Sequence, residues 1–273
     1  MKRLRTQVDQ IDHQILKLLQ KRTTLSKKIG QAKQKHNAPV YVPERERELL
    51  ARVTKRSNGK LPACAVTAIY REILSSSRAA QAQAPVGMLE ANAAAISPVA
   101  RWCFGACDEF KTFMTWASLA DALQTGALAA AVVSGGDLAA ALKKPAGRTQ
   151  FLSNLTIVGD LFAAQGKVEP LPRRLFIVIP RGPGVPAQVD HLLILIECKS
   201  PVNALNNLLT TMPDRPHTAQ QHALRPGSSL SLVGFPKAFD GQTLTTEVLS
   251  ACENLDAEIS ILGAYPGTET YGG

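Results

Sequence analysis

The sequence has no apolar run long enough to cross a membrane, and it has no disulfide framework. Its longest apolar stretches fall short of the roughly 18 residues that a membrane-spanning helix needs. The opening MKRLRTQVDQID is charged but has no apolar stretch behind it, unlike a signal peptide. The five cysteines are odd in number and form no Cys-x-x-Cys pair, which favours reduced thiols. With 45% hydrophobic residues, these absences predict a globular, cytoplasmic protein with no membrane partner.

Aromatic residues and acidic charge are both scarce in the first 82 residues. This segment has 18 basic and 6 acidic side chains, a charge of +12, whereas residues 83–273 have 13 and 16, a charge of −3. So strong a basic charge suggests one class of function, a non-catalytic regulatory or basic helical binding module. Tyr41 and Tyr70 are the only aromatic residues of the segment, so the aromatic interleaving of nucleic-acid binders is absent. We therefore expect no nucleic-acid partner and keep the binding module as an alternative.

Two stretches rich in small residues, glycine or proline divide the chain. AAQAQAP at 79–85 follows the basic segment, and PRGPGVP at 180–186 lies further on. Such stretches are typical of linkers. For 273 residues, we predict a helical domain at 1–83, an α/β domain at 84–182 and a smaller third domain at 187–273.

The basic segment has the pattern of a three-helix unit. Its apolar residues recur at alternating spacings of four and three, with no proline before Pro39, which predicts a helix of about 33 residues and about 50 Å. Prolines open two shorter helical patterns, at 43–56 and 62–82. Three helices make a thin core, so we expect a homodimer that interlocks the long helices. The seam of the long helix is Leu4, Val8, Ile11, Ile15, Leu18, Arg22, Leu25, Ile29 and Ala32.

Arg22 is the exception in this seam. One interpretation is a polar residue that sets the register, or an arginine that extends outward to water. The other is a buried cation that awaits an anionic ligand, because an unpaired buried charge is costly. Lys33 lies only about 20° from Arg22 around a helix of 3.6 residues per turn, so two cations share one face. Arg5 lies about 100° away and fits a pocket of the partner chain better than its own.

Three separated motifs in residues 2–83 resemble one enzyme family. They are LRTQVDQIDHQILKLLQKRTTLSKKIGQAK, then PVYVPERE, then AIYREILSSSRAAQ. Together they resemble the all-α class of chorismate mutases, and more closely the mutase domain fused to prephenate dehydratase in phenylalanine biosynthesis. The resemblance implies an intertwined homodimer that converts chorismate to prephenate, an intermediate of phenylalanine and tyrosine biosynthesis, without a metal or cofactor.

The resemblance also implies roles for individual residues. Arg22 and the other protomer's Arg5 would bind the two carboxylates of chorismate, while Lys33 and Gln81 would contact its ether oxygen. Glu46 would accept a hydrogen bond from the substrate hydroxyl. Lys33, Gln81 and Arg22 are therefore the predicted catalytic residues. The predicted substrate-binding set is Arg5, Arg22, Lys33, Val42, Arg45, Glu46, Ser77 and Gln81.

Three members of this set complete the predicted pocket. Ser77 matches a serine that helps hold a carboxylate, and Arg45 matches a pocket position. Val42 departs from the family, in which many members have aspartate, but the change matters little if the backbone N–H makes that contact.

The reaction explains why the segment needs no nucleophile or catalytic histidine. Chorismate rearranges to prephenate in one pericyclic step, so catalysis comes from holding a compact conformer and stabilising negative charge on the ether oxygen. Guanidinium groups bind carboxylates in a bidentate manner, whereas lysine supplies a point charge.

The rest of the chain reads as α/β structure. Residues 85–180 alternate short apolar runs with alanine-rich helices, which predicts a periplasmic-binding-like α/β layer domain, with RRLFIVIP at 173–180 as a buried strand. Gly135–Gly136 is either a turn or an anion cradle at a helix start. Residues 191–264 alternate strands and helices, and a further strand near 218–224 would make a βαββαβ unit that resembles the ACT regulatory domain of prephenate dehydratases.

The dehydratase motifs themselves are poorly kept. The glycine-rich opening motif is absent near PVGMLEANAAAIS, the Glu-Asn-Ser motif has become VVSGGDL, and only the arginine of the Thr-Arg-Phe motif persists, as Arg174. The effector loop Gly-Ala-Leu reads Asn203–Ala204–Leu205. We therefore predict a chorismate mutase that has lost dehydratase activity and ordinary phenylalanine feedback. A bifunctional enzyme that still makes phenylpyruvate is the alternative.

Overall fold

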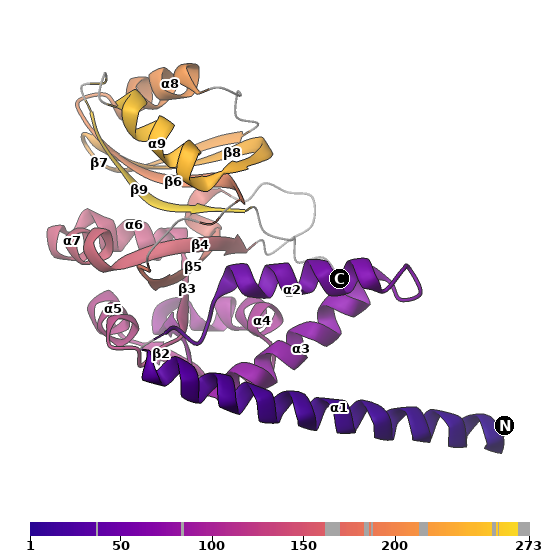
Figure 1. The fold of residues 1–273 in the computed structure, drawn as a ribbon. Helices are drawn as coiled ribbons and strands as arrows, with labels where there is room; N and C mark the ends of the chain where they lie inside the picture. Colours follow the sequence, from indigo (N-terminus) through magenta and orange to yellow (C-terminus); the bar gives the residue numbers. More distant parts are fainter. Residues whose placement is uncertain are drawn as a thin grey trace. The chain divides into compact units, whose positions relative to one another are not determined.

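The computed structural model describes residues 1–36, 38–82, 85–161, 170–182, 186, 188–212, 218–252, 255 and 257–266. They form two compact units (Figure 1). The first unit comprises Met1–Pro85 with Ala100–Phe110, and the second comprises Val86–Val99 with Lys111–Gly273. No helix of the described residues is long and apolar enough to cross a membrane.

Three helices form the body of the first unit, as the sequence predicts. They are α1, Lys2–Lys35, α2, Pro43–Arg56, and α3, Ala63–Gln81. α1 ends with two lysines in its last turn, and α2 opens with proline and two glutamates, so the charges at both ends suit the helix dipoles.

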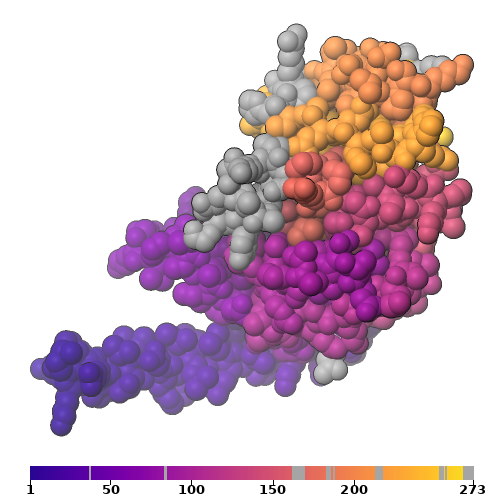
Figure 2. All heavy atoms as spheres, turned by 180° about the vertical axis from the view of Figure 1, so that it is seen from behind, coloured from indigo at the N-terminus to yellow at the C-terminus, as the bar shows by residue number. Residues whose placement is uncertain are grey.

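α1 packs against α3 through its C-terminal half. Every residue from 1 to 18 is exposed, whereas Ser26 and Gly30 are buried. Figure 1 shows α3 crossing near the C-terminal end of α1, and Figure 2 shows the side chains of the N-terminal half uncovered. Within one chain the seam is therefore open to solvent. Its large apolar residues, each between 48% and 64% exposed, are Leu4, Val8, Ile11, Ile15, Leu18, Leu25 and Ile29.

The two helices cross closely because Gly30 has no side chain. A Cβ atom at Gly30 would lie 2.4 Å from the carbonyl oxygen of Gln81, far inside contact distance. A larger residue would have to push α3 away. The glycine thus places the last turn of α3, which carries a predicted site residue, directly against α1.

The end of α4, Ala93–Phe104, and the turn after it also belong to the first unit. The rings of Phe104 and Tyr41 lie 5.1 Å apart, centroid to centroid. The Arg71 guanidinium lies 3.9 Å from the centroid of the Trp102 ring, a cation–π distance. These residues follow the predicted linker in the sequence, yet they pack with the three helices. The last linker residues before Pro85, at 83–84, lie outside the described residues.

The second unit begins with a mixed sheet of order β2-β1-β3-β5-β4. β1 and β3 are parallel, whereas β5 runs antiparallel to both β3 and β4. Three helices and the apolar side chains of β3 and β5 form the first core of this unit. The strands are β1, Val86–Leu89, β2, Phe110–Phe113, β3, Ala130–Ser134, β4, Leu155–Leu161, and β5, Leu175–Pro180, and the helices are α5, Trp116–Gln124, α6, Gly135–Lys143, and α7, Pro145–Asn154.

An antiparallel sheet of order β7-β8-β6-β9 completes the second unit. Successive residues of β6 point to opposite faces: Leu193 and Leu195 join the first core, whereas Leu192, Ile194 and Ile196 join a second core under α8 and α9. This explains why the strand reads as an unbroken apolar run. The elements are β6, Gln188–Glu197, α8, Pro201–Thr211, β7, Thr218–Arg225, β8, Ser228–Asp240, α9, Gly241–Cys252, and β9, Glu258–Tyr265.

The predicted fold class is confirmed: three helices precede a mixed α/β sheet and an antiparallel sheet of βαββαβ order. The weak strand expected near 218–224 is β7. The strand expected from 173 begins later, at Leu175, because Leu171–Arg173 forms a 3₁₀ turn. The predicted domain boundaries fall at or beside residues outside the described ranges, and they stay predictions.

Gly135–Gly136 opens α6 rather than a loop. Ser134 caps this helix, and the Asp137 carboxylate completes a capping box with it. The pair therefore begins a helix and is not the expected turn, and the Asp137 carboxylate at this helix start disfavours a bound anion.

Candidate active site

Arg22 lies where α1 meets α3, half-buried and held by neutral groups. Its Nη1 donates to the carbonyl oxygen of Ile73 at 3.1 Å and to the Ser77 hydroxyl. Ser77 in turn donates to the same carbonyl at 2.7 Å. Burial lowers the pKa of Arg22, and the nearby Tyr70 and Glu46 partly oppose this. The hydrogen-bond partners of Arg22 among the described residues are thus neutral, and a partly desolvated guanidinium with neutral partners keeps its charge available for an anion.

A cavity of about 200 Å³ opens beside this guanidinium. Glu72 contributes a carboxylate to its wall, but that carboxylate also accepts the backbone N–H of Ala106 at 3.0 Å. The cavity is small, and of the predicted site residues Arg22 and Ser77 line it. Its lining consists of Leu19, Arg22, Thr23, Glu72, Ile73, Ser76 and Ser77.

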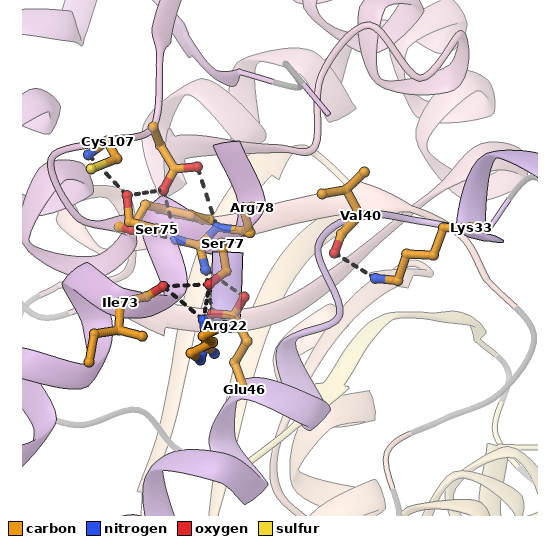
Figure 3. A network of polar contacts seen from close by, with 11 residues as sticks. Arg22, Lys33, Val40, Glu46, Ile73, Ser75, Ser77, Arg78 and Cys107 are labelled. Atoms are coloured by element: carbon orange, nitrogen blue, oxygen red, sulfur yellow. Dashed lines mark hydrogen bonds and ion pairs between the residues drawn. The ribbon is translucent and has the colours of Figure 1, made fainter. Parts of the chain in front are cut away.

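Lys33 lies eleven residues further along α1. Its Nζ donates to the carbonyl oxygen of Val40 at 2.9 Å, which leaves two of its three N–H groups for other acceptors. Burial lowers the pKa of Lys33, and Glu46 partly offsets this. Figure 3 shows Lys33 and Val40 to one side of the group formed by Arg22, Ser77 and Glu46.

Glu46 comes from the first turn of α2. Its two carboxylate oxygens accept hydrogen bonds from Nη1 of Arg78 at 2.5 Å and 2.6 Å. Burial raises the pKa of Glu46, Arg78 and Lys33 lower it, and Asp108 adds to the rise. The net shift is upward, so desolvation outweighs the ion pair.

The remaining predicted residues differ in burial and in their position along the helices. Gln81 ends α3, and its buried Oε1 has no hydrogen-bond partner among the described residues. Val42 is the residue before α2, and its carbonyl accepts the N–H of Glu46 at 3.2 Å. Arg45 is exposed and points to Glu48, 3.6 Å away. Arg5 is exposed in α1, about 25 Å along the helix from Arg22 at 1.5 Å per residue.

The structure thus brings part of the predicted set together. Arg22 and Ser77 touch, and Glu46 lies within electrostatic reach of Arg22 and Lys33. Arg5 and Arg45 do not join this group within one chain. Sequence reasoning missed Arg78 and the residues that hold it, because Arg78 follows three serines in the sequence and nothing there marks it as buried.

The sequence comparison agrees with this helical geometry. The family Chorismate mutase type II matches residues 4–82. Residues 4–82 form a chorismate mutase domain. The chain therefore carries a chorismate mutase catalytic domain, formed by the three helices described above.

Known proteins resemble this chain over different shares of its length. A bifunctional chorismate mutase/prephenate dehydratase of Aquifex aeolicus is 44% identical over 80 residues, which cover 28% of this chain and 22% of that relative. The match spans less than a quarter of the relative's length. A solved structure of a novel type of quorum quenching acylases has 16% identity and a TM-score of 0.47, covering 67% of this chain and 95% of its own. The prephenate dehydratase of Streptococcus mutans has 12% identity and a TM-score of 0.43, covering 68% and 100%.

Proposed function

We propose that the protein is a chorismate mutase that converts chorismate to prephenate in aromatic amino acid biosynthesis. The observation that carries the proposal is Arg22, a half-buried cation held by neutral groups beside a cavity, within the mutase domain. Chorismate is a dicarboxylate, so a desolvated guanidinium supplies the strongest single contact to it. The cytoplasmic location remains part of the proposal, consistent with free thiols at Cys64, Cys103, Cys107 and Cys198.

The proposed mechanism needs positioning and charge, with no covalent intermediate. Arg22 and Ser77 would hold one carboxylate and fix the compact conformer in which the new carbon–carbon bond forms. Lys33 and Gln81 would donate to the ether oxygen as the carbon–oxygen bond breaks and negative charge develops there. Glu46 would accept the hydrogen bond of the substrate hydroxyl. No proton has to move in this step, so the site needs no general acid or base.

A second copy of the chain would complete the site. The open seam of α1 is apolar over seven residues, and a second α1 is the surface that matches its heptad pattern. Because Arg5 lies about 25 Å from Arg22 along one rigid helix, it cannot reach its own pocket. An antiparallel partner helix would bring the partner's Arg5 to the second carboxylate.

An assay of chorismate consumption by the full chain tests the activity. We expect chorismate absorbance to fall and prephenate to form without added metal or cofactor. A purified, folded protein that leaves chorismate unchanged would refute the proposal.

Mixing two inactive variants tests the shared site. Arg5→Ala and Lys33→Ala should each be nearly inactive, whereas heterodimers combine both defects in one site and leave the other intact. In a two-fold symmetric dimer at statistical exchange, half of the dimers are mixed, so about a quarter of wild-type activity should return. Mixed dimers confirmed by mass spectrometry but without recovered activity would place Arg5 outside the partner's site.

We further propose that the protein makes no phenylpyruvate from prephenate. Arg174, the one arginine kept from the dehydratase motif, is buried and pairs with Asp160 at 2.5 Å. A guanidinium whose charge is neutralised by a buried carboxylate binds a substrate carboxylate only weakly. Robust phenylpyruvate formation that Arg174→Ala abolishes would favour the bifunctional alternative.

A further inference from the structure

Arg78 joins the mutase domain to residues that follow it in the chain. Its Nε donates to Oδ1 of Asp108 at 3.4 Å, and its Nη2 donates to Oδ2 of Asp108 at 2.7 Å and to the carbonyl oxygen of Phe104. Its Nη1 donates to both oxygens of Glu46. One guanidinium therefore bridges a predicted site residue and the turn after α4 (Figure 3).

The surroundings of Arg78 leave it little freedom. Only 5% of its surface is exposed, and its guanidinium lies 5.7 Å from the ring centroids of both Tyr41 and Phe104. Asp108 is also held, because Ser75 donates to its Oδ2 at 2.8 Å. Such buried, bidentate contacts fix the geometry of a side chain better than exposed ones.

Gly105 allows the turn to approach α3 this closely. Its φ of +93° is a conformation that other residues rarely adopt, and a Cβ atom there would lie 2.6 Å from Cβ of Ser75. The backbone N–H of Cys107 then donates to the Ser75 hydroxyl at 3.0 Å. The turn is thus shaped to bring Asp108 to Arg78.

We propose that Arg78 and Asp108 are positioning residues of the mutase reaction, and that they act through Glu46. On this view the working mutase site extends to residues 100–110, beyond the matched segment 4–82. The proposal rests on the proposed mutase function. A chain cut at residue 84 would contain every predicted site residue but would leave Arg78 without Asp108.

The charges of Arg78, Asp108 and Lys33 around Glu46 make the proposal testable through the pKa of Glu46. Arg78 favours the ionised form of Glu46, and Asp108 disfavours it. Lys33 also favours ionisation and is unchanged in the variants used below. Replacing Arg78 should therefore raise the pKa of Glu46, and replacing Asp108 should lower it.

The experiment measures kcat/KM of full-length variants for chorismate as a function of pH. The acid limb of this profile is the pH range in which activity falls as the pH drops. We expect Arg78→Met to shift the acid limb to higher pH by about one unit or more, the size of effect of a close opposite charge. We expect Asp108→Asn, which keeps the Arg78–Glu46 pair, to move it downward. Asp121→Asn, the same change at an exposed position of the second unit, should leave the pH profile of kcat/KM unchanged.

A second arm separates positioning from general stability. Arg78→Met should lower kcat/KM at neutral pH at least tenfold in the wild-type background but less than twofold in the Glu46→Gln background. An equal loss in both backgrounds would show that Arg78 acts on the fold and not through Glu46. If Arg78→Met does not fold, the test rests on Asp108→Asn. A shift of its acid limb to lower pH supports the proposal, and an unchanged acid limb overturns it. A wild-type protein without mutase activity would overturn the proposed function as well, whereas an active one with unmoved limbs overturns only the positioning role.

Discussion

One arginine of the mutase region and one of the α/β region differ in exposure and in their partners. Arg22, in the mutase region, donates to a carbonyl and a hydroxyl and borders a cavity. Arg174, in the α/β region, is 4% exposed and pairs with the buried carboxylate of Asp160. One charge has neutral partners and the other is neutralised by a fixed partner.

The difference teaches how to recognise a binding arginine in a structure without a ligand. Arg22 is half-buried, whereas Arg174 is almost fully buried, and their partners differ as well. A carboxylate neutralises the guanidinium, whereas neutral acceptors orient it and leave its charge for an anion. We therefore expect changes at Arg22 to reduce activity and changes at Arg174 to reduce stability.

The largest effect should follow from Arg22→Ala. Loss of a charge-assisted contact to the substrate should lower kcat/KM about a thousandfold, or ~4 kcal/mol of transition-state stabilisation. Lys27→Ala, an exposed change on the same helix, is the control and should be near wild type. Steady-state kinetics with circular dichroism would check this. A folded Arg22→Ala protein with more than a tenth of wild-type kcat/KM would contradict it.

Arg174→Met should reduce the stability of the protein and leave its mutase activity unchanged. The change leaves Asp160 buried without its cation, which should lower the free energy of unfolding by ~3 kcal/mol. The matched control is Arg173→Met, because Arg173 is exposed. Denaturant unfolding measures the loss, and chorismate turnover at low temperature should be unchanged. Equal stability of the two variants would mean that the Arg174–Asp160 pair contributes little.

The acid limit of mutase activity should reflect Glu46. Its pKa is raised above the ordinary 4.5 by burial, and the proposed role needs the ionised carboxylate. Activity should therefore fall as the pH drops through this raised pKa, at a pH above 4.5. Glu46→Gln should remove the limb, since an amide does not titrate. A wild-type limb at or below 4.5 would assign it to another group.

The smallest effect is expected for Glu48→Gln. Its ion pair with Arg45 joins two side chains that are each about 60% exposed. Such a pair contributes at most about 0.5 kcal/mol, because water screens it. Thermal unfolding and kcat/KM should both match wild type. A loss as large as that of Arg174→Met would show that Arg45 has a further role.

The helices of the mutase domain were predictable from the sequence because their signals are local. A four-and-three apolar repeat, a proline at the start of α2 and the absence of proline before residue 39 determine where the chain is helical. The shared face of Arg22 and Lys33 followed from the same period.

The partners of those side chains were decided only by the tertiary structure. No local pattern relates Arg78 to Asp108, thirty residues later, or Arg174 to Asp160, because these pairs depend on how distant elements pack. The sequence by itself determined the helices, the order of the folded parts and the charges available. Tertiary packing decided which charges are neutralised, since the energy of a buried charge depends on the few groups within hydrogen-bond distance.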